Sequence, residues 1–311
     1  MAFRMADAIG FSPTARGNLG IVVTEAATNL LKHAGGGEII LRDWDRRGVE
    51  VLAVDRGPGM RSVAQCQVDG FSTSGSPGTG LGAITRLSSG SEIYSVQGAG
   101  TIVQAFCESG LPGEEKPPRW DIGSIISPLP GEVMCGDAAS FREKRHIAQM
   151  MLVDGLGHGA LAAEAAQRAK EVFERATGEP RAVIEAMHDA LHNTRGAAAA
   201  VLQVDTYTQR ARYCGVGNIS GVILTGEHAQ HMISMNGILG HQMIRPREFE
   251  YAWSPNSLAV MYSDGISSRW QISQYPGLTG RRASVVAAAI FRDHRKSTDD
   301  ASVLAGKQSN Q

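Results

Sequence analysis

The segment that decides the fold is Met150–Glu164, MMLVDGLGHGALAAE, where an apolar run meets a glycine-rich turn and then an alanine-rich stretch. Met150–Val153 predicts a buried strand, and Ala160–Arg175 predicts a helix. Asp154 ends the strand, where burying an uncompensated carboxylate is costly, and the glycines after it give up conformational restraint. A hard metal ion bound at Asp154 would offset both costs.

The same design recurs at three other places. Asp137 follows Gly136, Asp264 ends the apolar run Leu258–Tyr262, and Asp299-Asp300 precede an apolar tail. Two carboxylates about 4 Å apart repel by roughly 4 kcal/mol at an effective dielectric constant near 20, so such a cluster requires cations. Mg²⁺ and Mn²⁺ prefer oxygen ligands, which fits carboxylates without an accompanying Cys and His set. One Asp-Gly after a strand is an ordinary turn, but four such sites in this order favour a metal centre.

With these motifs, residues 119–305 resemble the PPM-type metal-dependent Ser/Thr phosphatases of the SpoIIE and RsbX-like bacterial branch. The matching pieces are Gly136-Asp137, Asp154–Gly159, Gly215–Asn218, Ser263–Gly265 and Asp299-Asp300. The resemblance implies an α/β/β/α sandwich over residues 121–311. Within it, strand-like segments are predicted at 121–127, 132–139, 147–153, 196–204, 211–216 and 220–224, and a second helix at 180–192.

The resemblance also implies a site with two Mn²⁺ or Mg²⁺ ions and the ligands Asp137, Asp154, the Gly155 carbonyl, Asp264 and Asp299. Asp154 bridges the ions, Asp137 and Asp264 hold one ion each, and Asp300 is the alternative to Asp299. Hydrolysis then needs no protein nucleophile, because the ions lower the pKa of a water that attacks phosphorus in line.

Two further polar residues of these motifs have two readings each. His158 either protonates the leaving seryl oxygen or is a polar residue in a glycine turn. Asn218 either positions water at the metals or shapes a turn. No arginine of the sequence is clearly placed to clamp the substrate phosphate, so we expect affinity to depend on protein–protein docking.

The first 110 residues show a different pattern. Residues 14–34 predict a helix on which Glu25 and Asn29 lie one turn apart. Strands are predicted at 38–42, 49–54, 91–96 and 101–108, and a helix at 81–88. The second strand leads into Asp55–Gly59, and Gly78–Gly82 precedes the later helix, where glycines allow backbone N–H groups to approach phosphate.

This order of motifs resembles the GHKL (Bergerat) ATP-binding fold, and especially the RsbT-like anti-sigma-factor serine kinases. The resemblance implies a Bergerat-type α/β sandwich with a mixed sheet and helices on one face. Asn29 would coordinate the Mg²⁺ of ATP, Glu25 would be the general base, and Asp55 would bind the adenine amino group. The phosphates would be framed by Gly57, Gly59, Thr79, Gly80, Leu81 and Gly82.

Two features of this domain keep alternatives open. Lys32 and His33 either lie near the phosphates or are ordinary charges at a helix C-terminus. Relatives carry a strand and the start of a helix ahead of the segment matching Phe3–Phe11. Either the recorded start is downstream of the true one, or the sheet lacks an edge strand.

Composition bounds the remaining possibilities. The 311 residues suffice for two domains, here 1–110 and 121–311, joined by the proline-rich, charged linker 111–120. The 30 basic and 31 acidic residues give a net charge of −1, which argues against a nucleic-acid partner. No apolar run approaches the roughly 18 residues of a membrane span. The 4 cysteines have no CxxC spacing and suggest reduced thiols, so we expect a cytoplasmic protein.

A kinase-like ATP domain fused to a phosphatase implies a partner-switching regulator. The expected substrate is a phosphorylated STAS-domain protein of the anti-anti-sigma or stressosome type, and a sigma factor or downstream regulator is a further candidate partner. The alternative is a phosphatase whose ATP domain only docks or senses. A third reading, a non-enzymatic regulator, conflicts with the retained acidic residues.

Overall fold

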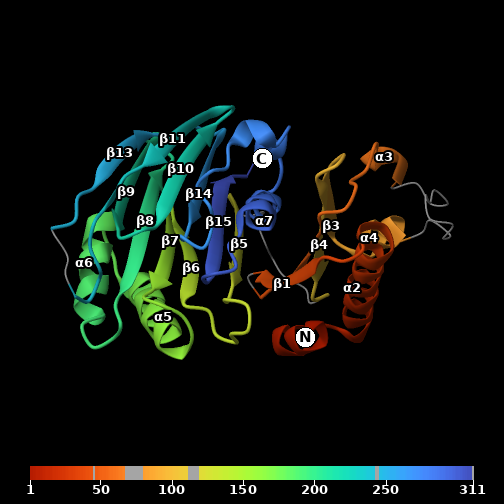
Figure 1. Cartoon of the computed structure of the whole chain (residues 1–311), viewed down its shortest axis with the longest axis horizontal. Helices are drawn as coiled ribbons and strands as arrows, with labels where there is room; N and C mark the ends of the chain where they lie inside the picture. The colour runs from red at the N-terminus through yellow and green to blue at the C-terminus, as the bar shows by residue number, and fades with distance from the viewer. Residues whose placement is uncertain (45, 67–79, 111–118, 242–244, 310–311) are drawn as a thin grey trace. The chain divides into compact units, whose positions relative to one another are not determined.

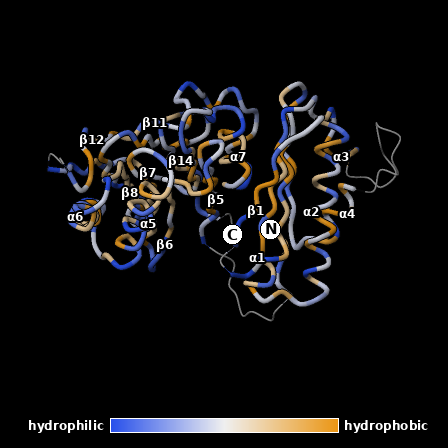
Figure 2. The backbone as a smooth tube through the Cα atoms, turned by 60° about the horizontal axis from the view of Figure 1, so that its bottom comes forward, coloured by the Kyte–Doolittle hydropathy of each residue, from blue (hydrophilic) through white to orange (hydrophobic). Residues whose placement is uncertain are grey.

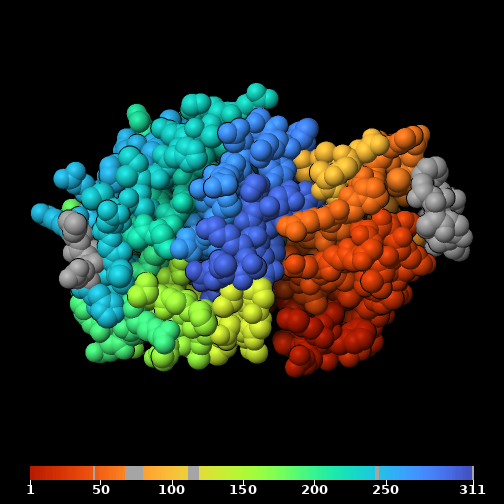
Figure 3. All heavy atoms as spheres, in the orientation of Figure 1, coloured from red at the N-terminus to blue at the C-terminus, as the bar shows by residue number. Residues whose placement is uncertain are grey.

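The computed structural model describes residues 1–44, 46–66, 80–110, 119–241 and 245–309. The chain forms two compact units, Met1–Pro117 and Pro118–Gln311, which can be followed by colour in Figure 3. Most of the predicted linker 111–120, and Thr79 of the predicted phosphate loop, lie outside the described residues.

The first unit packs helices on a four-stranded sheet of order β1-β2-β4-β3 (Figure 1). Its elements are α1 (Ala2–Ile9), α2 (Pro13–Ala34), β1 (Glu38–Trp44), β2 (Gly48–Val54), α3 (Val63–Cys66), α4 (Gly80–Leu87), β3 (Gly90–Val96) and β4 (Gly100–Glu108). Helix α2 begins where the Ser12 hydroxyl accepts the Ala15 N–H at 3.2 Å, and it ends at Gly35 with φ 70°.

The expectation of helices on one face is confirmed, but the sheet is not mixed. Leu19, Val22 and Ala26 of α2 share a buried cluster with alternate residues of the strands, such as Val51 and Ala105. In the sheet of this unit, every neighbouring pair of described strands is antiparallel. Strands β2 and β3 do run in the same direction, but the β3–β4 hairpin places β4 between them, so no parallel pair forms.

The second unit is the predicted α/β/β/α sandwich. One sheet has the order β11-β10-β14-β15-β5, and the other has the order β12-β9-β8-β7-β6 with β13 beside β9. Helices α5 and α6 contact the second sheet, whereas α7 contacts β5 and β15 of the first. The elements are β5 (Trp120–Ser127), β6 (Asp137–Lys144), β7 (Ile147–Gly155), α5 (Ala160–Arg175), α6 (Pro180–Ala190), β8 (Ala197–Asp205), β9 (Arg210–Val216), β10 (Ser220–Thr225), β11 (His228–Met232), β12 (Ser234–Met235), β13 (Phe249–Ala252), β14 (Ser257–Tyr262), α7 (Ala283–His294) and β15 (Ala301–Gln308).

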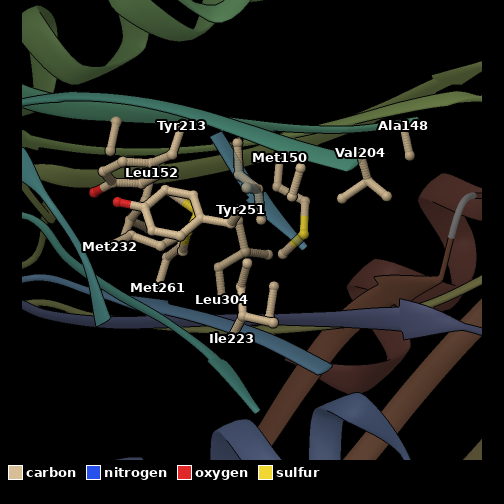
Figure 4. Packing of buried hydrophobic residues seen from close by; sticks show 14 of the residues in the cluster. Ala148, Met150, Leu152, Val204, Tyr213, Ile223, Met232, Tyr251, Met261 and Leu304 are labelled. Atoms are coloured by element: carbon tan, nitrogen blue, oxygen red, sulfur yellow. The ribbon is translucent and has the colours of Figure 1, made fainter. Parts of the chain in front are cut away.

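Strand β7 illustrates how the apolar sequence builds three layers. Met150 and Leu152 point into the core between the two sheets, which Figure 4 shows from close by. Met151 and Val153 point the other way and pack with residues of α5 and α6. Successive side chains of a strand alternate between its faces, so a continuous apolar run is what a strand buried on both sides requires. Figure 2 shows such hydrophobic stretches along the strands.

Strand β6 begins later than predicted. The sequence suggested a strand over 132–139, whereas the ladder runs from Asp137 to Lys144. The carboxylate of Asp300 accepts the backbone N–H groups of Leu129 and Gly136, each at 2.6 Å. These N–H groups are therefore satisfied without a partner strand. Within the described ranges, no helix combines the length and apolar character needed to cross a membrane.

Candidate metal centre and nucleotide cavity

Strand ends from both sheets of the second unit bring the predicted aspartates together. Asp137 opens β6 and pairs in register with Asp154 near the end of β7. Asp264 lies two residues after β14, and Asp299-Asp300 immediately precede β15, whose register pairs Tyr262 with Val303. A hydrogen bond of 2.7 Å from Ser263 Oγ to Asp137 Oδ2 joins the two groups. Aspartates from four distant segments therefore form one acidic cluster.

Asp137 is a deeply buried member of the cluster, with 5% of its surface exposed. Burial raises its pKa, the nearby hydroxyls of Ser302 and Ser263 lower it, and the neighbouring Asp300 and Asp299 raise it. Its second oxygen, Oδ1, is buried without a hydrogen-bond partner among the described residues. A buried carboxylate oxygen of this kind calls for a cation.

Asp154 shows most clearly that the carboxylates of the cluster repel one another. Burial raises its pKa, and so do the charges of Asp137, Asp264, Asp299 and Asp300, in that order. The largest charge effects on its pKa thus come from carboxylates, which repel the ionised form. Divalent cations would reverse this balance, because they favour the charged form.

Asp264 resembles Asp137, because one of its carboxylate oxygens accepts a hydrogen bond and the other is buried without a partner among the described residues. Asn218 donates its side-chain N–H to Asp264 Oδ2 at 2.7 Å, and Lys296 donates to the backbone carbonyl of Asp264 at 2.5 Å. Asp264 Oδ1 is buried and has no partner within the described part of the chain. Asn218 therefore orients a predicted metal ligand, a role that differs from both readings of the sequence, the positioning of water and the shaping of a turn.

The structure separates the roles of the adjacent Asp299 and Asp300. Asp300 is 2% exposed and uses both carboxylate oxygens to hold the 129–136 loop. Asp299 is less buried and, among the residues that the structure describes, accepts one hydrogen bond, from the N–H of Asp300 at 2.9 Å. Burial raises the pKa of Asp299. This arrangement favours Asp299 over Asp300 as the ligand.

Two glycines, Gly136 and Gly155, allow neighbouring segments of the chain to approach one another closely beside the cluster. A Cβ on Gly155 would lie 2.2 Å from the carbonyl oxygen of Ala162 in α5. A Cβ on Gly136 would lie 2.8 Å from Asp300 Oδ2. Gly155 also donates its N–H to the Gly136 carbonyl at 2.8 Å. Gly155 thus keeps its backbone close to both Gly136 and the first turn of the helix.

Glu132 is a polar residue at this site that sequence reasoning missed. Its Oε1 lies 2.9 Å from His158 Nδ1, and His158 is close enough to Asp299 to lower its pKa. The two residues are 26 positions apart, and no motif spacing links them. The pair gives His158 a defined orientation beside the acidic cluster.

The donor set fits hard divalent ions that keep part of their water shell. In the described residues, no three His, Cys, Asp or Glu side chains converge on one point as a complete ligand cage. The cluster instead offers carboxylates in pairs, the Gly155 carbonyl, and two buried oxygens without partners. Mg²⁺ is usually bound by one or two carboxylates plus waters, so the residues present fit the predicted ions.

The first unit contains a cavity of about 620 Å³ where the nucleotide is predicted. Its lining includes the predicted residues Asn29, Asp55, Gly59, Gly80 and Leu81, together with His33. The Nδ2 of Asn29 is buried without a hydrogen-bond partner in the described residues. Asp55 Oδ1 accepts the N–H groups of Gly57 and Thr101, at 2.8 and 3.1 Å, which fixes its carboxylate at the cavity wall.

Glu25 lies beside this cavity. A Cβ on Gly80 would stand 2.9 Å from Glu25 Oε2 and 3.3 Å from Asn29 Oδ1, so the start of α4 meets both α2 residues. Gly82 is buried inside α4 and Lys32 is exposed, and neither lines the cavity. His33 does line it, which favours a near-phosphate position for His33 over Lys32.

The fold and the acidic cluster define the class of the protein: a PP2C-type serine/threonine protein phosphatase joined to an ATPase-like domain. Residues 145–306 match the family described as stage II sporulation protein E (SpoIIE), and residues 1–106 match the histidine kinase-like ATPase domain. The first of these matches spans more than half of the chain. The chain belongs to the SpoIIE family.

Similar proteins support both halves of this assignment. The chain is 35% identical over 105 residues to the serine/threonine-protein kinase RsbT of Bacillus subtilis (strain 168), covering 33% of this chain and 79% of RsbT. It is 26% identical over 140 residues to the phosphoserine phosphatase RsbX of the same organism, covering 44% of this chain and 70% of RsbX. The solved structure of RsbX with magnesium shares the fold, with a TM-score of 0.55 at 20% identity over 63% of this chain and 98% of that one. The predicted resemblance to RsbT-like and SpoIIE/RsbX-like proteins is confirmed.

Proposed function

We propose that the second unit hydrolyses phosphoserine or phosphothreonine on a STAS-domain protein of a partner-switching pathway, with Mn²⁺ or Mg²⁺. The observation that carries this proposal is the cluster of aspartates whose charges raise the pKa of Asp154 and whose buried oxygens lack partners. The similarity to RsbX, a phosphoserine phosphatase, supports the reaction type. A STAS-domain substrate is what the resemblance implies.

The residues would divide the work as follows. Asp137, Asp154, the Gly155 carbonyl, Asp264 and Asp299 would hold the two ions, and the resemblance implies that both ions share Asp154. Bound divalent ions would supply Lewis-acid polarisation of the phosphoryl oxygens and activation of water. Ser263 and Asn218 orient two of these carboxylates through hydrogen bonds of 2.7 Å each.

The seryl leaving group needs a proton, and His158 can supply it. Glu132 holds the imidazole through Nδ1 and so favours a tautomer or imidazolium with the proton on that nitrogen. The other ring nitrogen would then face the leaving oxygen in its protonated form. His158→Gln should slow turnover of a phosphoserine protein more than that of p-nitrophenyl phosphate, whose leaving group needs no proton.

For the first unit we propose that it binds ATP with Mg²⁺. Asn29 would coordinate the ion and Asp55 would bind the adenine amino group. Gly57, Gly59, Thr79, Gly80 and Leu81 would frame the phosphates. The cavity and the unpartnered amide of Asn29 support this. Glu25 would act as general base if the unit phosphorylates the same STAS-domain protein. The similarity to the kinase RsbT favours this reading, and a docking or sensing module without kinase activity is the second candidate. We place the functional boundaries at 1–110 and 121–311, with a linker over 111–120.

Phosphate release from a phosphorylated STAS-domain protein tests the proposal, measured with the full chain, with Mn²⁺ or with EDTA, and with and without ATP. We expect release that requires metal and falls when ATP is added, because a kinase would restore the substrate. Metal-dependent release that is indifferent to ATP would support the docking module. Failure of the wild-type chain to release phosphate from any STAS-domain partner would reject the proposed substrate class.

A further inference from the structure

We propose that Arg195 binds the phosphoryl group of the substrate at the rim of the metal centre. The inference rests on the proposed phosphatase function and adds a residue that no motif of the sequence indicated. Arg195 lies in the turn between α6 and β8, far from the aspartates in sequence but beside the Asp154–Gly159 loop in the fold.

The position of the guanidinium follows from two contacts between the loops. A Cβ on Gly157 would lie 3.2 Å from Arg195 Nη1, so the side chain lies directly against this glycine. The adjacent backbone is tied down as well, because Leu156 donates its N–H to the Gly196 carbonyl at 2.9 Å. Gly157 has φ 84°, so a side chain there would be both strained and in close contact with the guanidinium.

This location is within reach of a phosphoryl group at the metals. Gly157 is three residues beyond Asp154, and three residues of extended chain span at most about 11 Å. In the β7–β8 ladder, Gly155 pairs with Ala197, two residues after Arg195. The guanidinium thus stands beside the loop that carries the predicted bridging ligand and the carbonyl ligand.

Arg195 is also available for an anion. It is exposed, and in the parts of the chain that the structure describes its guanidinium forms no ion pair or side-chain hydrogen bond. Its backbone carbonyl lies 3.1 Å from His241 Nε2, which restrains the turn without using the charged group. A planar guanidinium offers a fork of N–H donors that matches phosphate oxygens.

The electrostatics of the site make such a residue useful. The substrate phosphate is a dianion that must approach five neighbouring carboxylates, four of which already raise the pKa of the fifth, Asp154. A cation at the rim that is not paired with these aspartates can hold the substrate without withdrawing a ligand from the metals. This assigns Arg195 to substrate binding and leaves metal affinity to the aspartates.

The test compares Arg195→Met and Arg195→Lys with Arg175→Met in the full chain. Arg175 is an exposed arginine in the last turn of α5, about 22 Å along the helix from its start beside the metal loop. With p-nitrophenyl phosphate and Mn²⁺, we expect Arg195→Met to lower kcat/KM by about 10- to 100-fold, the range of a lost charge-assisted hydrogen-bond pair, mainly through KM. Arg195→Lys should retain part of the activity, and Arg175→Met should match the wild type.

Two further readouts separate this role from others. The Mn²⁺ concentration for half-maximal activity should stay unchanged in Arg195→Met. Inorganic phosphate, added with Mn²⁺, should raise the Tm of the wild type and of Arg175→Met but not that of Arg195→Met. This binding measurement does not need turnover, so it tests the inference even if the wild type hydrolyses nothing, which would contradict the proposed function instead. An Arg195→Met variant with wild-type KM and a wild-type phosphate-induced Tm shift would overturn the inference, as would a shifted Mn²⁺ requirement with unchanged KM.

Discussion

The adjacent residues Asp299 and Asp300 provide a sharp test, because the structure gives them opposite roles. Asp300 is buried and holds two backbone N–H groups of the 129–136 loop at 2.6 Å each. Asp299 is less buried and accepts one backbone N–H at 2.9 Å. We therefore expect Asp300→Ala to affect stability, and Asp299→Ala to affect metal binding.

The magnitude follows from the hydrogen bonds. Each hydrogen bond to a charged group contributes about 1.5–3 kcal/mol, and Asp300→Ala removes two and leaves their donors without a partner. The loss of one negative charge from the cluster offsets part of this, so we expect a net destabilisation of about 3 kcal/mol. For a unit of this size, 1 kcal/mol shifts Tm by roughly 2–4 °C, which gives a decrease of about 6–12 °C. Asp299→Ala should cost no more than about 1 kcal/mol, the value of one hydrogen bond.

Scanning calorimetry of the metal-free full chain measures both changes, and a Mn²⁺ titration of each variant measures the second role. Asp299→Ala should keep a near-wild-type Tm in EDTA but lose most of the Tm increase that Mn²⁺ produces. The reasoning fails if Asp300→Ala unfolds within 2 °C of the wild type, or if Asp299→Ala is the less stable of the two.

Three more predictions concern single side chains. Burial and neighbouring carboxylates raise the pKa of Asp154 above its unfolded value of about 3.9. The metal-free wild type is therefore most stable, with respect to this group, below that pH, and it loses this stability as the pH rises through the raised pKa. Metal-free Asp154→Asn should therefore have a higher Tm than the wild type at pH 8, by a margin that shrinks towards pH 5. Ser263→Ala removes the hydrogen bond to Asp137 and should cost about 1–2 kcal/mol and weaken Mn²⁺ binding, as calorimetry and titration would show. Asn29→Ala removes an unpartnered amide, so the Tm without ligand should stay within about 1 °C while the Tm increase caused by ATP and Mg²⁺ disappears; an unchanged ATP effect would contradict the assignment.

The sequence was most informative where a chemical requirement coincides with a strand end. Asp154 and Asp264 could be predicted as neighbours because each follows a buried apolar run and precedes glycine. The strands around them followed from the same runs, since β7 is buried on both faces. The choice between Asp299 and Asp300 could not be decided, because the burial of Asp300 and its hydrogen bonds to the 129–136 loop depend on contacts with residues far away in the sequence.

Helix α7 shows a different limit. Its residues Ala283–Arg292 are all buried, so the polar face that marks a surface helix is absent from the sequence. The fourth layer of the sandwich was therefore implied by the resemblance alone and not by a periodic pattern. Strand β6 was shifted for a related reason: the N–H groups before it are satisfied by Asp300, a contact across 164 residues from Gly136.

Residues that reach the site through long-range contacts could not be recognised from the sequence. Glu132 and Arg195 approach the Asp154–Gly159 loop only after the chain has folded, and neither belongs to a motif. In the first unit, the meeting of Gly80 with Glu25 and Asn29 was anticipated by the order of the motifs, whereas the antiparallel sheet was not. That sheet depends on where the β3–β4 hairpin inserts, which no local pattern records.

The most direct test of the metal centre is the number of Mn²⁺ ions that bind to the metal-free, nucleotide-free full chain, measured by titration calorimetry. We expect two ions for the wild type and fewer than one for Asp154→Ala, because this carboxylate would bridge both. A wild type that binds no Mn²⁺ at millimolar concentration, or an Asp154→Ala variant that still binds two ions, would contradict the account.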